Sequence, residues 1–146
     1  MSPDRFLDTN ILVHAHTEGD SRTAIARQLL FEGGFVSAQV LNEFASVARG
    51  KLGFMWPQVQ EAVDNILILC PNPRALSLDT HLRALGLSKR FGFSIWDGLI
   101  VAAAIEAKCS TLLTEDLQHG QVVEGVRIEN PFIRGLRPES KQAPTS

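Results

Sequence analysis

The sequence lacks most features of secreted and membrane-spanning proteins. It has two cysteines, Cys70 and Cys109, which are too few for a disulfide framework and are not spaced as a zinc pair. We expect both to be reduced, packed thiols. The segment Met1–Arg5 lacks the charged-then-apolar pattern of a secretion signal, and the longest apolar run, Leu99–Ile105, is too short to span a bilayer. These absences predict a soluble, cytoplasmic protein with no membrane segment.

The chain also lacks an excess of positive charge. Fourteen Lys and Arg face sixteen Asp and Glu, which gives a net charge of −2 and a pI near 6.1. Proteins that grip nucleic acid through a broad electrostatic field are usually basic. Contact with nucleic acid would therefore need a local basic patch, or a metal ion that offsets the protein's own acids.

Several familiar motifs are missing as well. The sequence shows no internal repeat, no phosphate-binding P-loop, no Gly-rich dinucleotide fingerprint and no evident Ser-His-Asp or Cys-His order. Its 146 residues, 45% apolar and 21% charged, suit one globular domain with a full core. From Gly135 onward the sequence loses its periodicity, so we expect one domain over residues 1–134 and a flexible tail over 135–146.

Short apolar segments alternate with helical patterns along the domain. The patterns predict strands near 6–8, 35–36, 111–114 and 126–128, and helices over 23–31, from 37, over 56–69, 77–90 and 94–107. Residues 11–13 either extend the first strand or begin a helix. This alternation predicts an α/β fold with a parallel sheet and helices on both faces. Functional sites of such sheets form beyond the carboxyl ends of the strands.

Four acidic residues stand where a core-forming sequence would not be expected to place them. Asp8 and Asp116 follow predicted strands, Asp97 opens the most apolar helix, and Glu43 lies within an apolar helical stripe. A buried carboxylate is costly unless it is paired or binds a metal. Carboxylates suit Mg²⁺ or Mn²⁺, which lower the pKa of a bound water and stabilise the oxygens of an in-line displacement. We therefore predict a metal site at one edge of the sheet.

Each acid also has a simpler explanation. Asp97 could form a helix cap with Ser94, Asp8 could cap the turn after it, and Asp116 could merely end a strand. Glu43 could be exposed at the helix edge or pair with a cation such as Arg49 or Lys51. It is their joint placement that favours the metal. His14 and His16 are two residues apart and would not share a helix face, so we do not expect them to bind it.

The sequence resembles the PIN domain, and more closely the VapC-type toxins of bacterial toxin–antitoxin pairs. The resemblance covers about residues 4–133, and four segments carry it: Phe6–Asn10, Glu43 on its helix, Ser94–Ala104 and Thr111–Leu117. It implies a three-layer α/β/α sandwich with a central, mostly parallel five-stranded sheet. It also implies a Mg²⁺- or Mn²⁺-dependent endoribonuclease that forms a homodimer. A small cognate antitoxin would place its tail in the acidic site.

The resemblance also assigns roles by position. Asp8, Glu43, Asp97 and Asp116 match the catalytic and metal-binding acids. The supporting positions are Thr114, a small hydroxyl residue near the last acid, and Thr9 and Asn10, which follow the first. Glu115 departs from the pattern, and it is the alternative to Asp116 for the same role.

The leading hypothesis is therefore metal-dependent cleavage of RNA. Arg83, Lys89 and Arg90 form the densest basic cluster before the central acids, and they either cover a solvated face or hold the RNA backbone. A second hypothesis is a PIN-fold module that binds RNA or a partner but holds metal too weakly to cut. A third, a phosphatase, is weakened because Asp8-Thr9-Asn10 lacks the second Asp that an aspartyl-phosphate enzyme uses as its acid.

Overall fold

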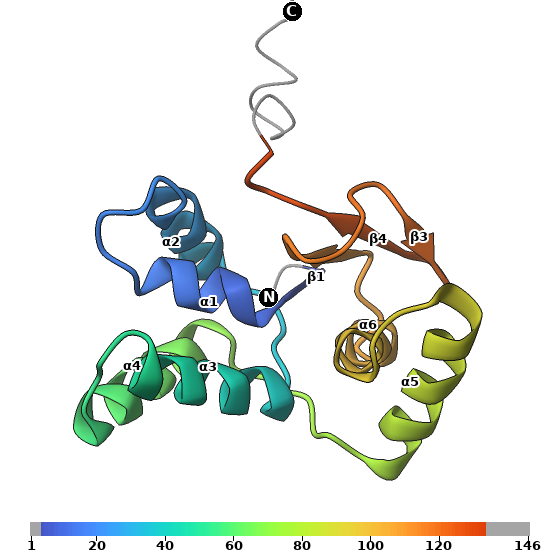
Figure 1. Ribbon diagram of the computed structural model, residues 1–146, viewed down its shortest axis with the longest axis horizontal. Helices are drawn as coiled ribbons and strands as arrows, with labels where there is room; N and C mark the ends of the chain where they lie inside the picture. The colour runs from blue at the N-terminus through green and yellow to red at the C-terminus, as the bar shows by residue number, and fades with distance from the viewer. Residues whose placement is uncertain (1–3, 134–146) are drawn as a thin grey trace, which may run out of the picture.

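A computed structural model describes residues 4–133, so the predicted tail over 135–146 lies outside the described residues. The described chain contains a four-stranded sheet in the order β1-β2-β4-β3 (Figure 1). Strands β1 (Arg5–Leu7), β2 (Thr111–Leu113) and β4 (Val126–Glu129) are parallel, and β3 (Val122–Val123) pairs antiparallel with β4 at the edge. The predicted α/β class with a mostly parallel sheet is therefore confirmed.

The described residues form four strands where five were expected. The segment near 35–36 contributes a single bridge to β1, in which the Leu7 amide donates to the Phe35 carbonyl over 2.8 Å. Ser37 then caps the next helix, since its hydroxyl accepts from the Val40 amide. The segment is thus too short to form a ladder.

Between residues 4 and 133, six helices cover the sheet and its flank. They are α1 (Thr9–Ala15), α2 (Thr23–Glu32), α3 (Ala38–Gly50), α4 (Trp56–Leu69), α5 (Leu78–Phe91) and α6 (Ile95–Glu106). All five helices predicted from periodicity are present. The ambiguous residues 11–13 belong to α1, which begins where the Asp8 carboxylate accepts from the Thr9 amide.

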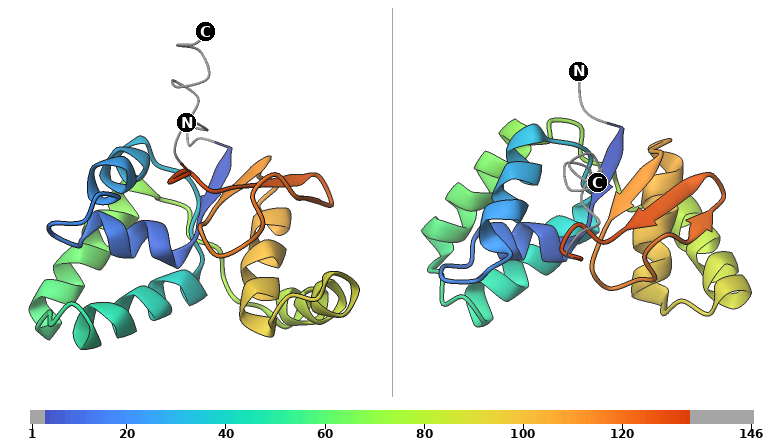
Figure 2. Two further views of the ribbon diagram at one scale, coloured as in Figure 1. Left: turned by 45° about the horizontal axis from the view of Figure 1, so that its top comes forward. Right: turned by 90° about the horizontal axis from the view of Figure 1, so that it is seen from above.

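The helices form two groups, one on each side of β1 (Figures 1 and 2). Helices α1 to α4 pack against one another, while α6 contacts β2, β4 and α5. Every residue of α6 from Gly98 to Ala104 is buried, as its uniformly apolar sequence predicts. At the β3–β4 edge, Val122 and Arg127 are exposed. The three-layer arrangement therefore does not extend over that edge.

One apolar core joins the two groups of helices to the sheet. Its largest fully buried side chains include Phe6, Phe44, Ile66 and Ile128. Both cysteines are free and buried, as expected, and burial raises the pKa of Cys70 to about 11 and that of Cys109 to about 12. Within residues 4–133, no helix has the length and apolar character needed to cross a membrane.

Candidate active site

Asp8 lies at the junction of β1 and α1 and is only 4% exposed. One carboxylate oxygen accepts from the Thr9 amide over 2.6 Å, and the other accepts from the Thr114 hydroxyl over 2.8 Å. Burial raises the pKa of Asp8 to about 6, and the charges of Asp116 and Glu43 add to the rise. Its hydrogen bonds oppose the shift without cancelling it. Asp8 is therefore a buried carboxylate without a compensating cation among the described residues.

Asn10 connects Asp8 to Asp116 across the ends of β1 and β2. Its amide nitrogen lies 3.0 Å from an Asp116 oxygen, 3.2 Å from the Thr114 hydroxyl and 3.5 Å from an Asp8 oxygen. The Thr114 hydroxyl also accepts from the Asp116 amide over 3.0 Å. Parallel strands end at the same edge, which is why these distant residues meet. Asn10 and Thr114 therefore both contact Asp8 and Asp116, the acids that they were predicted to support.

Glu43 enters the same region from α3. Its two oxygens accept from the Thr9 hydroxyl over 2.7 Å and from the Gln39 amide over 3.2 Å. It forms no ion pair with Arg49 or Lys51, the partners that would have explained it as a structural acid. Gln39 is one turn before Glu43 and is buried, so it fixes the orientation of this carboxylate.

Asp97 occupies the first turn of α6. The Ser94 hydroxyl caps the helix by accepting from the Asp97 amide over 3.1 Å. Partial burial raises the pKa of Asp97, and the charges of Asp116 and Glu43 raise it further. The helix cap proposed as the simple explanation is therefore present, but the charges of two other acids also affect the pKa of Asp97. No direct hydrogen bond joins it to them in the described residues.

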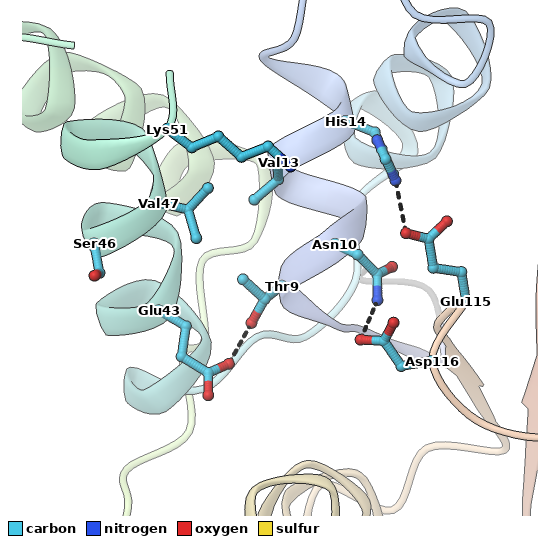
Figure 3. A pocket seen from close by; sticks show the side chains of 10 residues that line it. All are labelled: Thr9, Asn10, Val13, His14, Glu43, Ser46, Val47, Lys51, Glu115 and Asp116. Atoms are coloured by element: carbon cyan, nitrogen blue, oxygen red, sulfur yellow. Dashed lines mark hydrogen bonds and ion pairs between the residues drawn. The ribbon is translucent and has the colours of Figure 1, made fainter. Parts of the chain in front are cut away.

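A pocket of about 490 Å³ opens between α1, α3 and the segment after β2 (Figure 3). Its lining contains the following residues: Thr9, Asn10, Val13, His14, Glu43, Ser46, Val47, Lys51, Glu115 and Asp116. Glu43 and Asp116 therefore face the pocket directly. Asp8 and Asp97 are outside this lining, although Asp8 contacts the lining residues Thr9 and Asn10.

The side chains around Asp8 suit a hydrated hard cation. Within the described part of the chain, no three His, Cys, Asp or Glu side chains are grouped to hold one metal directly. Mg²⁺ usually keeps several waters and takes only one or two protein carboxylates. Two buried oxygens beside the acids, Asn10 Oδ1 and Gln39 Oε1, have no hydrogen-bond partner among the described residues. All of these donors are oxygens, which Mg²⁺ and Mn²⁺ prefer.

Glu115 is directed away from the other acids. His14 Nε2 lies 2.9 Å from one of its oxygens, and Arg22 Nη1 donates to the other over 3.1 Å. Arg22 is itself held by Asp20, whose pKa the guanidinium lowers to about 2. Glu115 is therefore paired with the Arg22 guanidinium and contacts the His14 ring, whereas Asp116 is held by Asn10 (Figure 3). This geometry favours Asp116 for the acidic role.

The predicted basic cluster lies apart from the pocket. Arg83 is 3.4 Å from Glu106 and 3.6 Å from Glu124, and Arg90 is 3.6 Å from Glu124. Neither these arginines nor Lys89 line the pocket. The cation that does line it through an exposed side chain is Lys51, which sequence reasoning considered only as a partner for Glu43. Its spacing of eight residues from Glu43 on one helix could have indicated it.

The fold and the site define an α/β domain with acidic residues gathered at the carboxyl ends of parallel strands. The sequence profile of the PIN domain matches residues 5–124, and the chain belongs to the PIN domain family. This confirms the family that the motifs indicated. No curated protein matches the chain.

Solved structures of toxins have the same fold. The toxin–antitoxin complex from Klebsiella pneumoniae is 22% identical, with a TM-score of 0.64, over 84% of this chain and 94% of that chain. VapBC2 from Rickettsia felis, solved with a promoter DNA fragment, is 23% identical, with a TM-score of 0.62, over 86% and 97%. VapC20 from Mycobacterium tuberculosis, a toxin that cleaves the sarcin–ricin loop, is 18% identical, with a TM-score of 0.59, over 74% and 86%.

Proposed function

We propose that this protein is a Mg²⁺- or Mn²⁺-dependent endoribonuclease and the toxin of a toxin–antitoxin pair. The observation that supports this most is electrostatic. Asp8 and Asp97 come from opposite sides of the fold, burial raises the pKa of both, and the charges of Asp116 and Glu43 add to the rise. Asp116 and Glu43 therefore act on both carboxylates, and a cation bound here would offset these like charges.

Each of these residues has a distinct proposed role. Asp8 and Asp97 are the main metal ligands, and Glu43 and Asp116 complete the site or orient a water. Asn10 and Thr114 hold Asp8 and Asp116 in place, while Thr9 and Gln39 hold Glu43. The bound metal would supply a water of lowered pKa and offset the charge that develops on the phosphate. Glu43 and Asp116 would orient a water toward phosphorus; hydrolysis would form one bond from the water oxygen to phosphorus and break one P–O bond, and the leaving oxygen would take up the water's proton.

The toxin assignment rests on family and on structural neighbours. VapC toxins are ribonucleases, and the neighbours from Klebsiella pneumoniae and Rickettsia felis were solved as toxin–antitoxin assemblies. We therefore propose a small antitoxin protein and a second copy of this chain as partners. Nearby genes offer a check, since an antitoxin would be encoded by a short reading frame just upstream.

The test uses purified protein, a mixed RNA pool and Mn²⁺. We expect cleavage that a chelator abolishes. The Asp97→Asn variant should fold normally and lose at least about a hundredfold in cleavage rate, because changing even a residue that only supports a metal ligand costs about 10–100-fold. The matched control is Asp79→Asn, which removes an exposed acid from the first turn of α5.

Other outcomes select the other hypotheses. RNA that binds without being cut, and no Mg²⁺ or Mn²⁺ uptake by calorimetry, would favour the binding module. Turnover of small phosphoesters through a covalent aspartyl intermediate would favour the phosphatase. Full cleavage by folded Asp97→Asn protein would refute the proposed nuclease site.

A further inference from the structure

The pocket between α1 and α3 carries opposite charges at its two ends (Figure 3). Glu43 and Asp116 are at one end, and Lys51 extends across the other, from the end of α3 toward α1. A pocket that bound only a metal ion would need no cation at the end opposite the acids. The charge pattern instead suits a ligand with an anionic group some distance from the acids.

The geometry of α3 sets that distance. Glu43, Val47 and Lys51 are four residues apart and therefore lie along one side of the helix. The backbone keeps its helical path to the last of them, because the Lys51 amide donates to the Val47 carbonyl over 2.8 Å. Eight residues at about 1.5 Å each place Lys51 about 12 Å from Glu43 along the helix axis. One extended chain can therefore reach both ends of the pocket.

Lys51 is free to bind an anion, unlike the other basic side chains near the pocket. His14 contacts Glu115, and Arg22 is bound to Asp20 and Glu115. Lys51 is exposed and forms no ion pair with any other residue between 4 and 133. An ammonium group in this position costs little to move and gains a charge-assisted contact when a phosphate arrives.

The wall between the two ends is apolar. Val13 of α1 and Val47 of α3 face each other across the pocket, with Ser46 beside them (Figure 3). Such a wall suits the ribose and base of a nucleotide, whose flat or weakly polar surfaces need no ionic partner. Along the pocket, the acids are followed by the apolar wall and then by the lysine. Along an RNA strand, the phosphate to be cleaved is likewise followed by a nucleoside and then by the neighbouring phosphate.

We propose that Lys51 binds a backbone phosphate of the RNA substrate, next to the nucleotide that occupies the Val13–Val47 wall. The inference rests on the proposed ribonuclease function and identifies where the strand runs. Lys51 anchors the strand so that the phosphate to be cleaved lies over Glu43 and Asp116. It acts on binding and takes no part in the bond-breaking step.

The first experiment measures binding without cleavage. Fluorescence anisotropy compares Asp97→Asn with Asp97→Asn carrying Lys51→Met, using a fluorescein-labelled random-sequence RNA in Mn²⁺. Methionine keeps the length of the side chain and removes its charge. We expect about tenfold weaker binding, as one lost charge-assisted contact would give. The slope of log affinity against log salt should fall by about 0.7, which is one phosphate contact on a single strand.

Two matched variants complete this experiment. Lys108→Met removes an equally exposed charge outside the pocket and should leave both the affinity and the salt slope unchanged. Lys51→Arg keeps the charge and should restore binding. Equal affinity and equal slope with and without Lys51→Met, or no measurable RNA binding at all, would overturn the inference.

A second measurement separates this inference from the proposed function. In the otherwise unaltered enzyme, Lys51→Met should raise KM about tenfold and leave kcat unchanged, because it removes binding and not chemistry. If the unaltered protein cleaves RNA but KM does not change, the nuclease proposal stands and the role of Lys51 fails. If nothing is cleaved but anisotropy depends on Lys51, the phosphate site stands and the nuclease proposal fails.

Discussion

Asp8 combines two demands that normally conflict. It caps α1 through the Thr9 amide, and it is buried beside other acids whose charges raise its pKa. A cap works best when the carboxylate is ionised, whereas burial favours the protonated form. Without a metal, ionisation of the Asp8 carboxyl near neutral pH therefore destabilises the folded protein.

The first prediction concerns this strain in metal-free protein. Folding raises the pKa of Asp8 from its ordinary 3.8 to about 6, so protonation favours the folded state. The stabilisation is fully present below about pH 4 and is lost as pH rises through about 6, which amounts to roughly 3 kcal/mol at most. Urea unfolding in chelator, at pH values on both sides of 6, measures this loss.

Asp8→Asn provides the comparison. Asn cannot ionise but can still cap α1, so its unfolding free energy should fall less between pH 4 and 7 and exceed that of the unaltered protein above pH 7 by about 1–3 kcal/mol. Exposed Asp79→Asn should follow the unaltered curve. An unchanged pH slope in Asp8→Asn would show that the Asp8 carboxyl is not the group responsible.

The sequence identified the acids better than their neighbours. The prediction of the four acids was possible because each carboxylate conflicts with apolar surroundings, and the sequence alone shows that conflict. These acids are Asp8, Glu43, Asp97 and Asp116. Gln39 and Lys51 have no such conflict, since each is an ordinary polar residue on a helix. Their four- and eight-residue spacings from Glu43 place both on its side of α3, but only the packing of α1 against α3 forms the pocket that Lys51 lines.

At the scale of elements, α6 is positioned by its close contact with α5. Gly98 follows Asp97, and a Cβ added there would lie 2.5 Å from the Ser88 hydroxyl and 2.9 Å from the Ala84 carbonyl. The serine side chain can rotate, but the Ala84 carbonyl belongs to the backbone of α5. The absence of a side chain at Gly98 therefore sets the distance between the helices and, with it, the place of Asp97.

The second prediction compares two helical glycines. Gly98→Ala should destabilise the protein by about 1–3 kcal/mol, because α5 and α6 must move apart. Gly86→Ala is the matched control: it lies within α5, with no atom within 4 Å of an added Cβ, and should be neutral or stabilising by up to about 1 kcal/mol. Thermal unfolding of both variants measures the difference, and similar stabilities would contradict the packing argument.

Periodicity revealed the long elements and missed the short ones. Helices of ten or more residues show several turns of an apolar pattern, so all five were predicted. Strand β3 has two residues and shows no pattern of its own. The available signal in the sequence was the glycine of the turn that follows it. Glu124 and Gly125 have φ values of 47° and 88°, as a tight two-residue hairpin requires.

At the scale of the whole molecule, α5 presents an unusual surface. Leu78, Leu82 and Leu85 follow one another on successive turns and are 71%, 54% and 47% exposed. Such a row is costly in water and commonly marks a protein–protein interface. In the homodimer proposed above, a two-fold interface would place this row of one copy against the same row of the other. We therefore propose a second copy of this chain as its occupant.

The third prediction tests that assembly by light scattering coupled to size exclusion. The unaltered protein should be a dimer, and Leu82→Glu should be a monomer. In a dimer of this variant, the two new carboxylates, one from each copy, would lose water and face each other near the two-fold axis. Ile68→Glu changes a residue of α4 that is 74% exposed and should leave the dimer intact. If Leu82→Glu remains dimeric while Ile68→Glu dissociates, α4 and not α5 forms the interface. The pockets of the two copies would then be arranged differently about the axis, and an antitoxin that reaches both acidic sites would have to follow another path.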